Sequence, residues 1–427
     1  MGVPDLVALG MGAVVGSGVF VLTGVAAARY AGPGVILSLL IAALTASLTA
    51  LAYAELAALV PVAGSAYTYT YVALGELAAW VVGWDLLHEY AMVGGAVAIG
   101  WSSYAAELLA AAGLELPHHL AAPPAAGGLI NLPALLVVIA LTALLLAGLR
   151  ESLGASRALV AVKLVALFLF LALGLPRIDP AHWRPLLPLG LGGVTRGAAL
   201  VFFAFIGFDA VSTATRQARN PGRDLPRGIV GSLLAATLLY LAVAAVLTGL
   251  VPSASLDTPS PLTVALSRAG AAWAAPVVGL GAVAGLTSVL LVSLFGLSRI
   301  LHAMSADGLL PPFFSRARQP VTLLAGLATG LAAALLDLGK TVELANIGTL
   351  IAFALVNLGV IALRRARPDL RRPFRMPLVP YLPVLAGVTA LYLMSRLPSL
   401  TWWRFGVWLL SGLVVYFLYG RRHSRVP

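Results

Sequence analysis

Long apolar runs recur along this chain, and short segments rich in proline, glycine and charged residues separate them. An apolar run of roughly 18 residues or more can cross the ~30 Å hydrocarbon core of a bilayer as a helix. The pattern predicts twelve such spans, with centres near residues 14, 46, 92, 140, 165, 206, 239, 288, 329, 352, 387 and 411. We therefore expect an all-α membrane protein with twelve transmembrane helices.

The composition supports this expectation. Hydrophobic residues make up 60% of the 427 residues and charged residues only 10%, and the mean hydropathy is +0.98. A soluble domain of this length needs far more polar surface. The chain has no cysteine, which excludes disulfides and thiolate metal sites. Its six histidines lack metal-ligand spacing, and His118 and His119 stand in a Pro/Gly-rich loop that we expect to be solvated. We expect no metal and no cofactor.

The positive charge is distributed unevenly between alternate loops. Loops expected on the same side of the membrane as the N-terminus hold eighteen Lys and Arg residues, and those expected on the opposite side hold eight. The positive-inside rule then places both termini in the cytoplasm, as an even number of spans requires. The net charge of +11 is thus a topology signal, and we expect no nucleic-acid partner.

Two predicted spans contain features that a lipid-facing helix avoids. Gly16, Ser17 and Gly18 fall in the middle of the first span, where each glycine weakens a helix by ~1 kcal/mol. The sixth span has Gly207 in its middle, followed by Asp209. Unwound backbone at membrane depth is tolerated where it lines a protein cavity. Its freed N–H groups and carbonyls bind a carboxylate and an ammonium, respectively. Close helix packing is the alternative for the first span, but the matched sixth span favours a binding site.

The two interrupted spans are the first and the sixth, five positions apart in the order of spans. This spacing fits an inverted repeat with a central substrate site. On this basis we divide the chain into a first repeat at residues 1–180, a second repeat at 190–365 and two C-terminal helices at 376–420.

Several ionisable residues fall inside predicted spans. Lys163, one of two lysines, lies about two turns inside the fifth span, where a charge costs about 2.5–3.5 kcal/mol or more unless it is paired or neutralised. We interpret it as a proton-coupling amine, and a snorkelling or structurally paired lysine is the alternative. Asp85 and Glu89 share a face of the third span at i, i+4. Glu89 is a candidate partner for Lys163 or for a basic substrate, with a structural hydrogen bond equally open, and Asp209 is the other deep acid.

Two features near the cytoplasmic ends of spans are expected to be structural. Glu55 lies near the cytoplasmic end of the second span. The basic run RRARPDLRRPFR after the tenth span reads as a topogenic cytoplasmic loop that can also contact anionic lipid headgroups.

Five motifs occur in one order along the chain: GMGAVVGSGVFVLTG, YAELAALVPVAGSAYTYTY, WDLLHEY…GWSSY, FFAFIGFDAVSTAT…ARNPGRDLPRGI and SRILHAMSADGLLPPFF. Together they resemble the amino acid–polyamine–organocation transporters, specifically the cationic amino acid transporter branch and its bacterial relatives. The resemblance runs from Val3 to Leu418.

The resemblance implies a LeuT-like 5+5 inverted repeat with broken helices 1 and 6 and two extra C-terminal helices. It implies that the substrate carboxylate meets the N–H groups of Ser17 and Gly18 beside Gly16, with the carbonyl of Val14 across the break. The ammonium would meet the carbonyls of Phe203, Ala204 and Ile206, with the Phe203 ring as a lid. Lys163 falls where proton-coupled relatives carry a lysine in place of a sodium ion.

The sequence departs from the family pattern after the sixth span, where Arg216 and Gln217 replace a frequent pair of glutamates. A gate salt bridge made by those acids is therefore in doubt here. The eighth span offers Thr287, Ser288 and Ser293 towards the expected side-chain pocket.

We therefore expect a secondary transporter that imports amino acids across the cytoplasmic membrane by proton symport. Exchange of amino acids or polyamines without proton coupling is the alternative, and the choice between cationic and small neutral substrates stays open. An enzyme would need a nucleophile, metal or phosphate-loop motif, which the sequence lacks. A channel would need a continuous polar stripe, whereas FFAFIGF favours an occluded site. We expect a monomer in membrane lipid and leave a small accessory subunit open.

Overall fold

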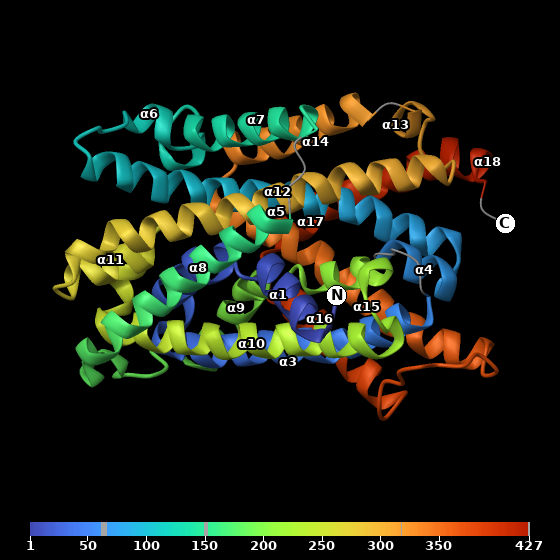
Figure 1. The fold of residues 1–427 in the computed structure, drawn as a ribbon, viewed down its shortest axis with the longest axis horizontal. Helices are drawn as coiled ribbons and strands as arrows, with labels where there is room; N and C mark the ends of the chain where they lie inside the picture. Colours follow the sequence, from blue (N-terminus) through green and yellow to red (C-terminus); the bar gives the residue numbers. More distant parts are fainter. Residues whose placement is uncertain (61–65, 149–152, 317, 426–427) are drawn as a thin grey trace.

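The computed structural model describes residues 1–60, 66–148, 153–316 and 318–425. Within these ranges the regular structure is helical, and the only β-type pairing is an isolated bridge between Ala121 and Asn131. Long helices lie side by side along the longest axis of the molecule, and the C-terminus lies at one end of it (Figure 1). The expected all-α class is confirmed.

Up to Gly174, the described residues form eight α-helices. They are α1 (Val3–Val14), α2 (Thr23–Ala26), α3 (Val35–Leu59), α4 (Ala66–Leu74), α5 (Glu76–Ala111), α6 (His118–Ala121), α7 (Leu132–Leu146) and α8 (Leu153–Gly174). Local signals set several of the helix starts. The side chain of Asn131, for example, accepts a hydrogen bond from the Ala134 amide and caps α7.

Ten more α-helices follow among the described residues from Gly190 onward. They are α9 (Gly190–Val201), α10 (Pro221–Leu250), α11 (Pro261–Arg268), α12 (Ala275–Ala306), α13 (Phe313–Arg316), α14 (Arg318–Leu335), α15 (Leu338–Ala366), α16 (Tyr381–Ser395), α17 (Ser399–Val415) and α18 (Arg421–His423). Proline occupies the first helical position of α10 and α11, where its missing N–H costs no hydrogen bond.

Seven helical stretches among the described residues are long and apolar enough to cross a membrane. They are Gly18–Leu59, Ala158–Arg177, Gly190–Ser212, Pro221–Leu250, Ala272–Ala306, Leu338–Ala366 and Ser399–His423. Four shorter apolar helices accompany them: Val3–Val14, Leu132–Leu146, Gln319–Leu335 and Tyr381–Ser395. Helical segments surround all twelve predicted centres. The count of twelve spans, the LeuT-like repeat and the division at 1–180, 190–365 and 376–420 stay predictions.

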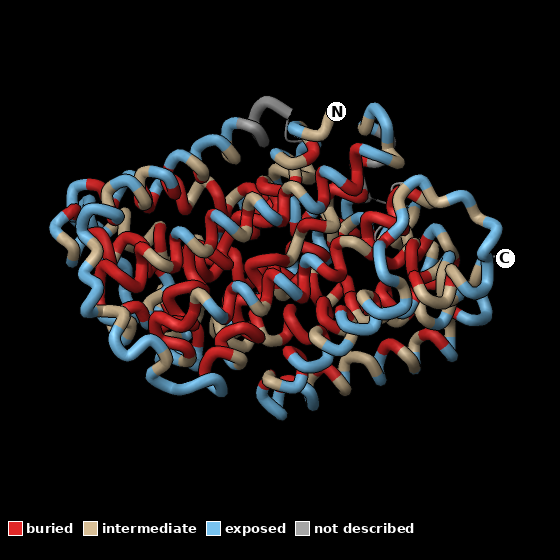
Figure 2. Tube along the Cα trace, turned by 90° about the horizontal axis from the view of Figure 1, so that it is seen from below, coloured by how far each residue is buried: buried red, intermediate tan, exposed pale blue. Residues whose placement is uncertain are grey.

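Buried residues fill the middle of the molecule, and exposed ones lie around it (Figure 2). One buried group is an aromatic cluster, in which the ring centroid of Phe208 lies 5.4 Å from that of Tyr53 and 5.4 Å from that of Phe353. The outer surface carries large apolar side chains, such as Leu191 at 70% and Trp403 at 76% exposure. A surface of this kind is suited to hydrocarbon rather than to water.

Candidate functional site

The first predicted interruption is present between Val14 and Gly18. Helix α1 ends at Val14, Val15 has extended backbone, and a π-helical stretch, η1, begins at Gly18 and ends at Leu22. The carbonyl of Gly16 accepts hydrogen bonds from the amides of Val19 and Phe20, each at 3.2 Å, and so starts the second half-helix. The N–H groups at the start of η1 have no partner within their own helix.

The second interruption lies at Ile206 and Gly207. Helix α9 continues into a 3-10 turn, η7 (Phe202–Phe205), and a second 3-10 stretch, η8, runs from Phe208 to Gln217. Gly207 has φ +109°, a conformation that strongly favours glycine. The backbone therefore turns at the residue where the sequence predicted a break.

The two interruptions are packed directly against each other. A Cβ added to Gly18 would lie 2.3 Å from the Cα of Ala204, and one added to Gly207 would lie 3.1 Å from the carbonyl oxygen of Ala13. Only glycine permits such an approach at Gly18, because the atom that it meets belongs to the backbone. The unwound parts of both helices thus face one another.

Tyr240 of α10 joins the two interruptions. Its hydroxyl oxygen lies 2.8 Å from the carbonyl oxygen of Val14 and 3.1 Å from that of Ala204, so its one hydrogen can be donated to either. The side chain is fully buried. This contact could not be predicted from the sequence, because Tyr240 stands in an ordinary apolar helix 226 residues from Val14.

A small cavity of about 50 Å³ opens between the interruptions, several times the minimum space for one water. Helices α5 and α12 close its other sides. The lining residues are Ala13, Val14, Gly16, Ser17, Gly18, Glu89, Tyr90, Val93, Phe203, Ile206, Gly207, Asp209, Ala210, Val289, Val292 and Ser293. Seven of the eight predicted substrate-binding residues are in this set, and the eighth, Ala204, packs behind Gly18.

Ser17 brings a polar side chain to this cavity. Its hydroxyl is buried, with the residue 1% exposed, and it has no hydrogen-bond partner among the described residues. A buried hydroxyl without a partner costs free energy unless a ligand or water satisfies it. The Ser293 hydroxyl, by contrast, donates to the carbonyl of Val289 at 3.0 Å.

The other two polar residues predicted from the eighth span lie outside the cavity lining. The Thr287 hydroxyl donates to the carbonyl of Val283 at 2.7 Å and accepts from the Trp101 indole at 3.0 Å. Ser288 donates to the carbonyl of Gly285 at 2.8 Å. Helical spacing alone could not show that Ser293 lines the cavity and that Thr287 and Ser288 do not.

Lys163 lies beside the first interruption rather than in the cavity. Its side chain is fully buried, and its ammonium donates to the carbonyls of Gly12 at 2.5 Å and Val15 at 2.7 Å. Gly285 of α12 makes room for it, since a Cβ there would lie 2.9 Å from the Cβ of Lys163. The lysine thus contacts one carbonyl in the last turn of α1 and one just after it, where a positive charge is favourable.

The three acids of the predicted third and sixth spans occupy different places. Glu89 and Asp209 line the cavity, and Asp209 stands in the first turn of η8. Asp85 lies one turn of α5 away from Glu89, with both carboxyl oxygens buried and without a hydrogen-bond partner in the described residues. It packs against Gly348 of α15, where a Cβ would approach it to 2.1 Å.

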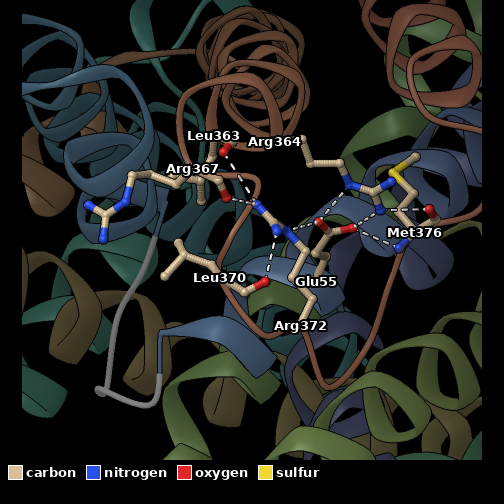
Figure 3. Close-up of polar contacts among 7 residues, drawn as sticks. All are labelled: Glu55, Leu363, Arg364, Arg367, Leu370, Arg372 and Met376. Carbon is tan, nitrogen blue, oxygen red and sulfur yellow. Dashed lines mark hydrogen bonds and ion pairs between the residues drawn. The ribbon is translucent and has the colours of Figure 1, made fainter.

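Glu55 forms a buried ion cluster with Arg364, in the last turn of α15, and Arg372, in the loop after it (Figure 3). Its carboxylate accepts from Arg364 at 2.5 and 3.0 Å and from the Met376 amide at 2.7 Å, and lies 3.4 Å from the Arg372 guanidinium. Glu55 is 2% exposed and the Arg372 side chain 5%. Arg364 and Arg372 therefore pair with a buried acid inside the fold, in addition to the topogenic role expected for the basic run.

Replacing Glu55 by glutamine is expected to destabilise the protein by about 3–5 kcal/mol, because it leaves buried guanidinium charge unpaired. The matched control is Asp369→Asn, since Asp369 forms an exposed pair with Arg367 at 3.8 Å that is worth about 0–1 kcal/mol. Equilibrium unfolding of the purified variants measures both. A Glu55→Gln protein as stable as the Asp369→Asn protein would contradict this role.

The structure describes only part of the residue pair predicted at the cytoplasmic gate, Arg216 and Gln217. The side chain of Arg216 lies outside the described residues, as does the segment 149–152 between α7 and α8. The backbone carbonyl of Gln217 accepts a hydrogen bond from the N-terminal ammonium of Met1 at 2.5 Å. This contact holds the start of α1 against the end of η8.

Comparisons with known proteins show which proteins this chain is similar to. The model of the family described as amino acid permease matches residues 1–421. The chain is 46% identical to the branched-chain amino acid permease BcaP of Bacillus subtilis (strain 168), covering 100% of this chain and 94% of that protein. It is 41% identical to the methylthioribose transporter of the same organism, covering 98% and 93%. It is also 41% identical to the vacuolar cationic amino acid transporter 2 of Arabidopsis thaliana, covering 86% and 60%.

Proposed function

The chain belongs to the amino acid permease family of the amino acid–polyamine–organocation superfamily, and from this premise we propose that it imports α-amino acids by proton symport. The resemblance expected from five motifs is thereby confirmed. Family and relatives are permeases and transporters, and the apolar helices fit a multi-pass membrane protein. We further propose that the protein lies in the cytoplasmic membrane, that both of its termini are in the cytoplasm, and that it is a monomer.

The observation that carries this proposal is the meeting of two helix interruptions around one cavity. The substrate carboxylate binds the N–H groups of Ser17 and Gly18, at the positive end of η1, and the Ser17 hydroxyl donates to it. The substrate ammonium binds carbonyls at the end of the first half of the other helix, on Phe203, Ala204 and Ile206. The Tyr240 hydroxyl donates its one hydrogen to the carbonyl of Val14 or of Ala204, and either carbonyl keeps at least one lone pair for the substrate.

The side chain of the substrate is proposed to be aliphatic. The cavity is small, and the walls away from the backbone groups are formed by Val93, Val289, Val292 and the ring of Phe203. Such walls stabilise an aliphatic side chain by removing its surface from water. The name of the branched-chain amino acid permease, 46% identical over the whole chain, points the same way.

Glu89 favours a second candidate, a cationic amino acid. It lines the cavity and one of its carboxyl oxygens has no hydrogen-bond partner among the described residues. A carboxylate in this position would pair with the charged end of an arginine or lysine substrate. The cationic amino acid transporter of Arabidopsis thaliana, 41% identical, supports this candidate by its name.

Proton coupling is proposed to act through Lys163. A protonated amine favours the carbonyls of Gly12 and Val15 at the end of α1, and loss of the proton weakens that contact. The shape of the first interruption, and with it the site, then depends on whether the lysine is charged. Exchange without protons is the alternative.

The substrate is identified by thermal unfolding of the purified protein with each of the twenty amino acids and common polyamines. We expect valine, leucine and isoleucine to stabilise it, by about 2.7 kcal/mol at a concentration one hundred times Kd. Stabilisation by arginine or lysine that is lost in Glu89→Gln would establish the second candidate instead. Stabilisation by no amino acid would contradict the proposed function.

A further inference from the structure

A second cavity lies at one end of α12, away from the site just described. It has a volume of about 390 Å³ and is formed by α7, α12 and α14. The residues that line it are Leu145, Phe295, Ser298, Arg299, His302, Ala303, Val321 and Thr322. Arg299 and His302 belong to the motif SRILHAMSADGLLPPFF, which the proposed transport cycle does not use.

The polar part of this cavity is basic. Arg299 and His302 stand one turn apart on α12, both exposed, and neither makes a hydrogen bond or an ion pair within the described residues. The guanidinium of Arg299 lies over the ring of Phe295 instead, at 5.4 Å from its centroid. Two neighbouring donors without acidic partners form a site for an anion.

The remaining walls are apolar and continue onto the outer surface. Leu145 and Val321 face the cavity, and the Phe295 side chain is 40% exposed. Further along α14, Leu324 is 41% and Leu327 58% exposed. An occupant with a charged head and an apolar body matches this combination better than a free amino acid or inorganic anion does.

The depth of the cavity in a bilayer follows from the length of α12. Its 32 residues span about 48 Å at 1.5 Å per residue, against a hydrocarbon core of ~30 Å. If α12 is centred, each end extends about 9 Å, or six residues, beyond the core. Arg299 and His302 then lie on either side of the boundary between hydrocarbon and headgroups, on the side that the positive-inside rule assigns to the cytoplasm.

We propose that this cavity binds an anionic phospholipid of the cytoplasmic leaflet. Arg299 and His302 hold the phosphate. The acyl chains lie along Phe295 and the exposed leucines of α14. Anionic lipids are concentrated in the cytoplasmic leaflet, which provides the charge complementary to this pair.

The test compares the full-length protein in vesicles of phosphatidylcholine alone and of phosphatidylcholine mixed with phosphatidylglycerol in equal parts. Thermal unfolding and native mass spectrometry measure stabilisation by phosphatidylglycerol and the number of its molecules retained. We expect Arg299→Gln to lower the affinity for phosphatidylglycerol about fivefold, and Arg299→Gln combined with His302→Gln to lower it further. The control is Arg371→Gln, which removes an exposed arginine from the basic loop on the same side.

Each outcome decides the proposal. It is supported if the preference for phosphatidylglycerol falls in Arg299→Gln and persists in Arg371→Gln. Full preference in the Arg299→Gln protein overturns it, and an equal loss in Arg371→Gln assigns the effect to diffuse surface charge. Stabilisation of the detergent-solubilised protein by inorganic phosphate alone, lost in Arg299→Gln, would show a soluble-anion site instead. If Arg299→Gln does not fold, His302→Gln is judged by the same criteria.

Discussion

A protein with Gly18 replaced by alanine is expected to lose substrate binding and uptake by roughly tenfold to a hundredfold. The added methyl group would lie 2.3 Å from the Cα of Ala204 and 3.0 Å from its amide nitrogen. These are backbone atoms, so the two interruptions must move apart, and overpacking of this kind costs about 1–3 kcal/mol. Each 1.4 kcal/mol lost from substrate binding is a factor of ten in affinity.

The control for this variant is Gly387→Ala in α16, where an added Cβ meets no atom within 4 Å. Uptake into proteoliposomes is measured for both proteins after size-exclusion chromatography has shown that each is folded. Uptake by Gly18→Ala at the rate of Gly387→Ala would mean that the close contact between the interruptions is not needed for transport.

Replacing Lys163 by glutamine is expected to abolish uptake driven by a proton gradient. Glutamine keeps a hydrogen-bond donor near the carbonyls of Gly12 and Val15, but it cannot take up or release a proton. The measurement is uptake into proteoliposomes with an inward proton gradient, repeated over a range of external pH.

Lys340, the second lysine of the chain, provides the control. It pairs with Asp337 at 2.6 Å near the surface, with 37% of its side chain exposed, so Lys340→Gln is expected to leave the pH dependence unchanged. Wild-type pH dependence in Lys163→Gln would remove the lysine from proton coupling. Uptake that requires amino acid inside the vesicle, with no response to pH, would favour exchange.

Local sequence signals were sufficient to predict both helix interruptions. Glycine in the middle of an apolar span weakens the helix wherever the span is placed, and Gly207 adopts a backbone conformation that other residues rarely reach. The positions of Gly16 to Gly18 and Gly207 therefore carried structural information that requires no knowledge of neighbouring helices.

Contacts between distant segments could not be predicted in this way. Tyr240 reaches Val14 from 226 residues away, and Glu55 meets Arg364 from 309 residues away. A hydroxyl in an apolar helix and an acid at a helix end are common, and neither specifies its partner. The one usable signal was Glu55 itself, an acid near the end of a predicted span that is expected on the same side as a loop with six arginines.

Lys163 could be predicted only in part, because the sequence marked the residue but not its partners. Its place inside a span marked it as functionally important, because a charged amine in hydrocarbon needs a partner. Periodicity did not show which helix supplies that partner, and the family resemblance implied only that Lys163 takes the place of a sodium ion. In the structure the partners include the carbonyls of Gly12 and Val15, while Glu89, the other candidate, lines the cavity.

The central claim is that the two interruptions hold the α-carboxylate and the α-ammonium of an amino acid. It is tested most directly by comparing the best-binding amino acid with a derivative that is N-acetylated and converted to its amide, so that both charges are removed and the side chain is kept. We predict that the free amino acid stabilises the purified protein and that the doubly blocked derivative neither stabilises it nor competes for uptake. Tight binding of the doubly blocked derivative would contradict the account.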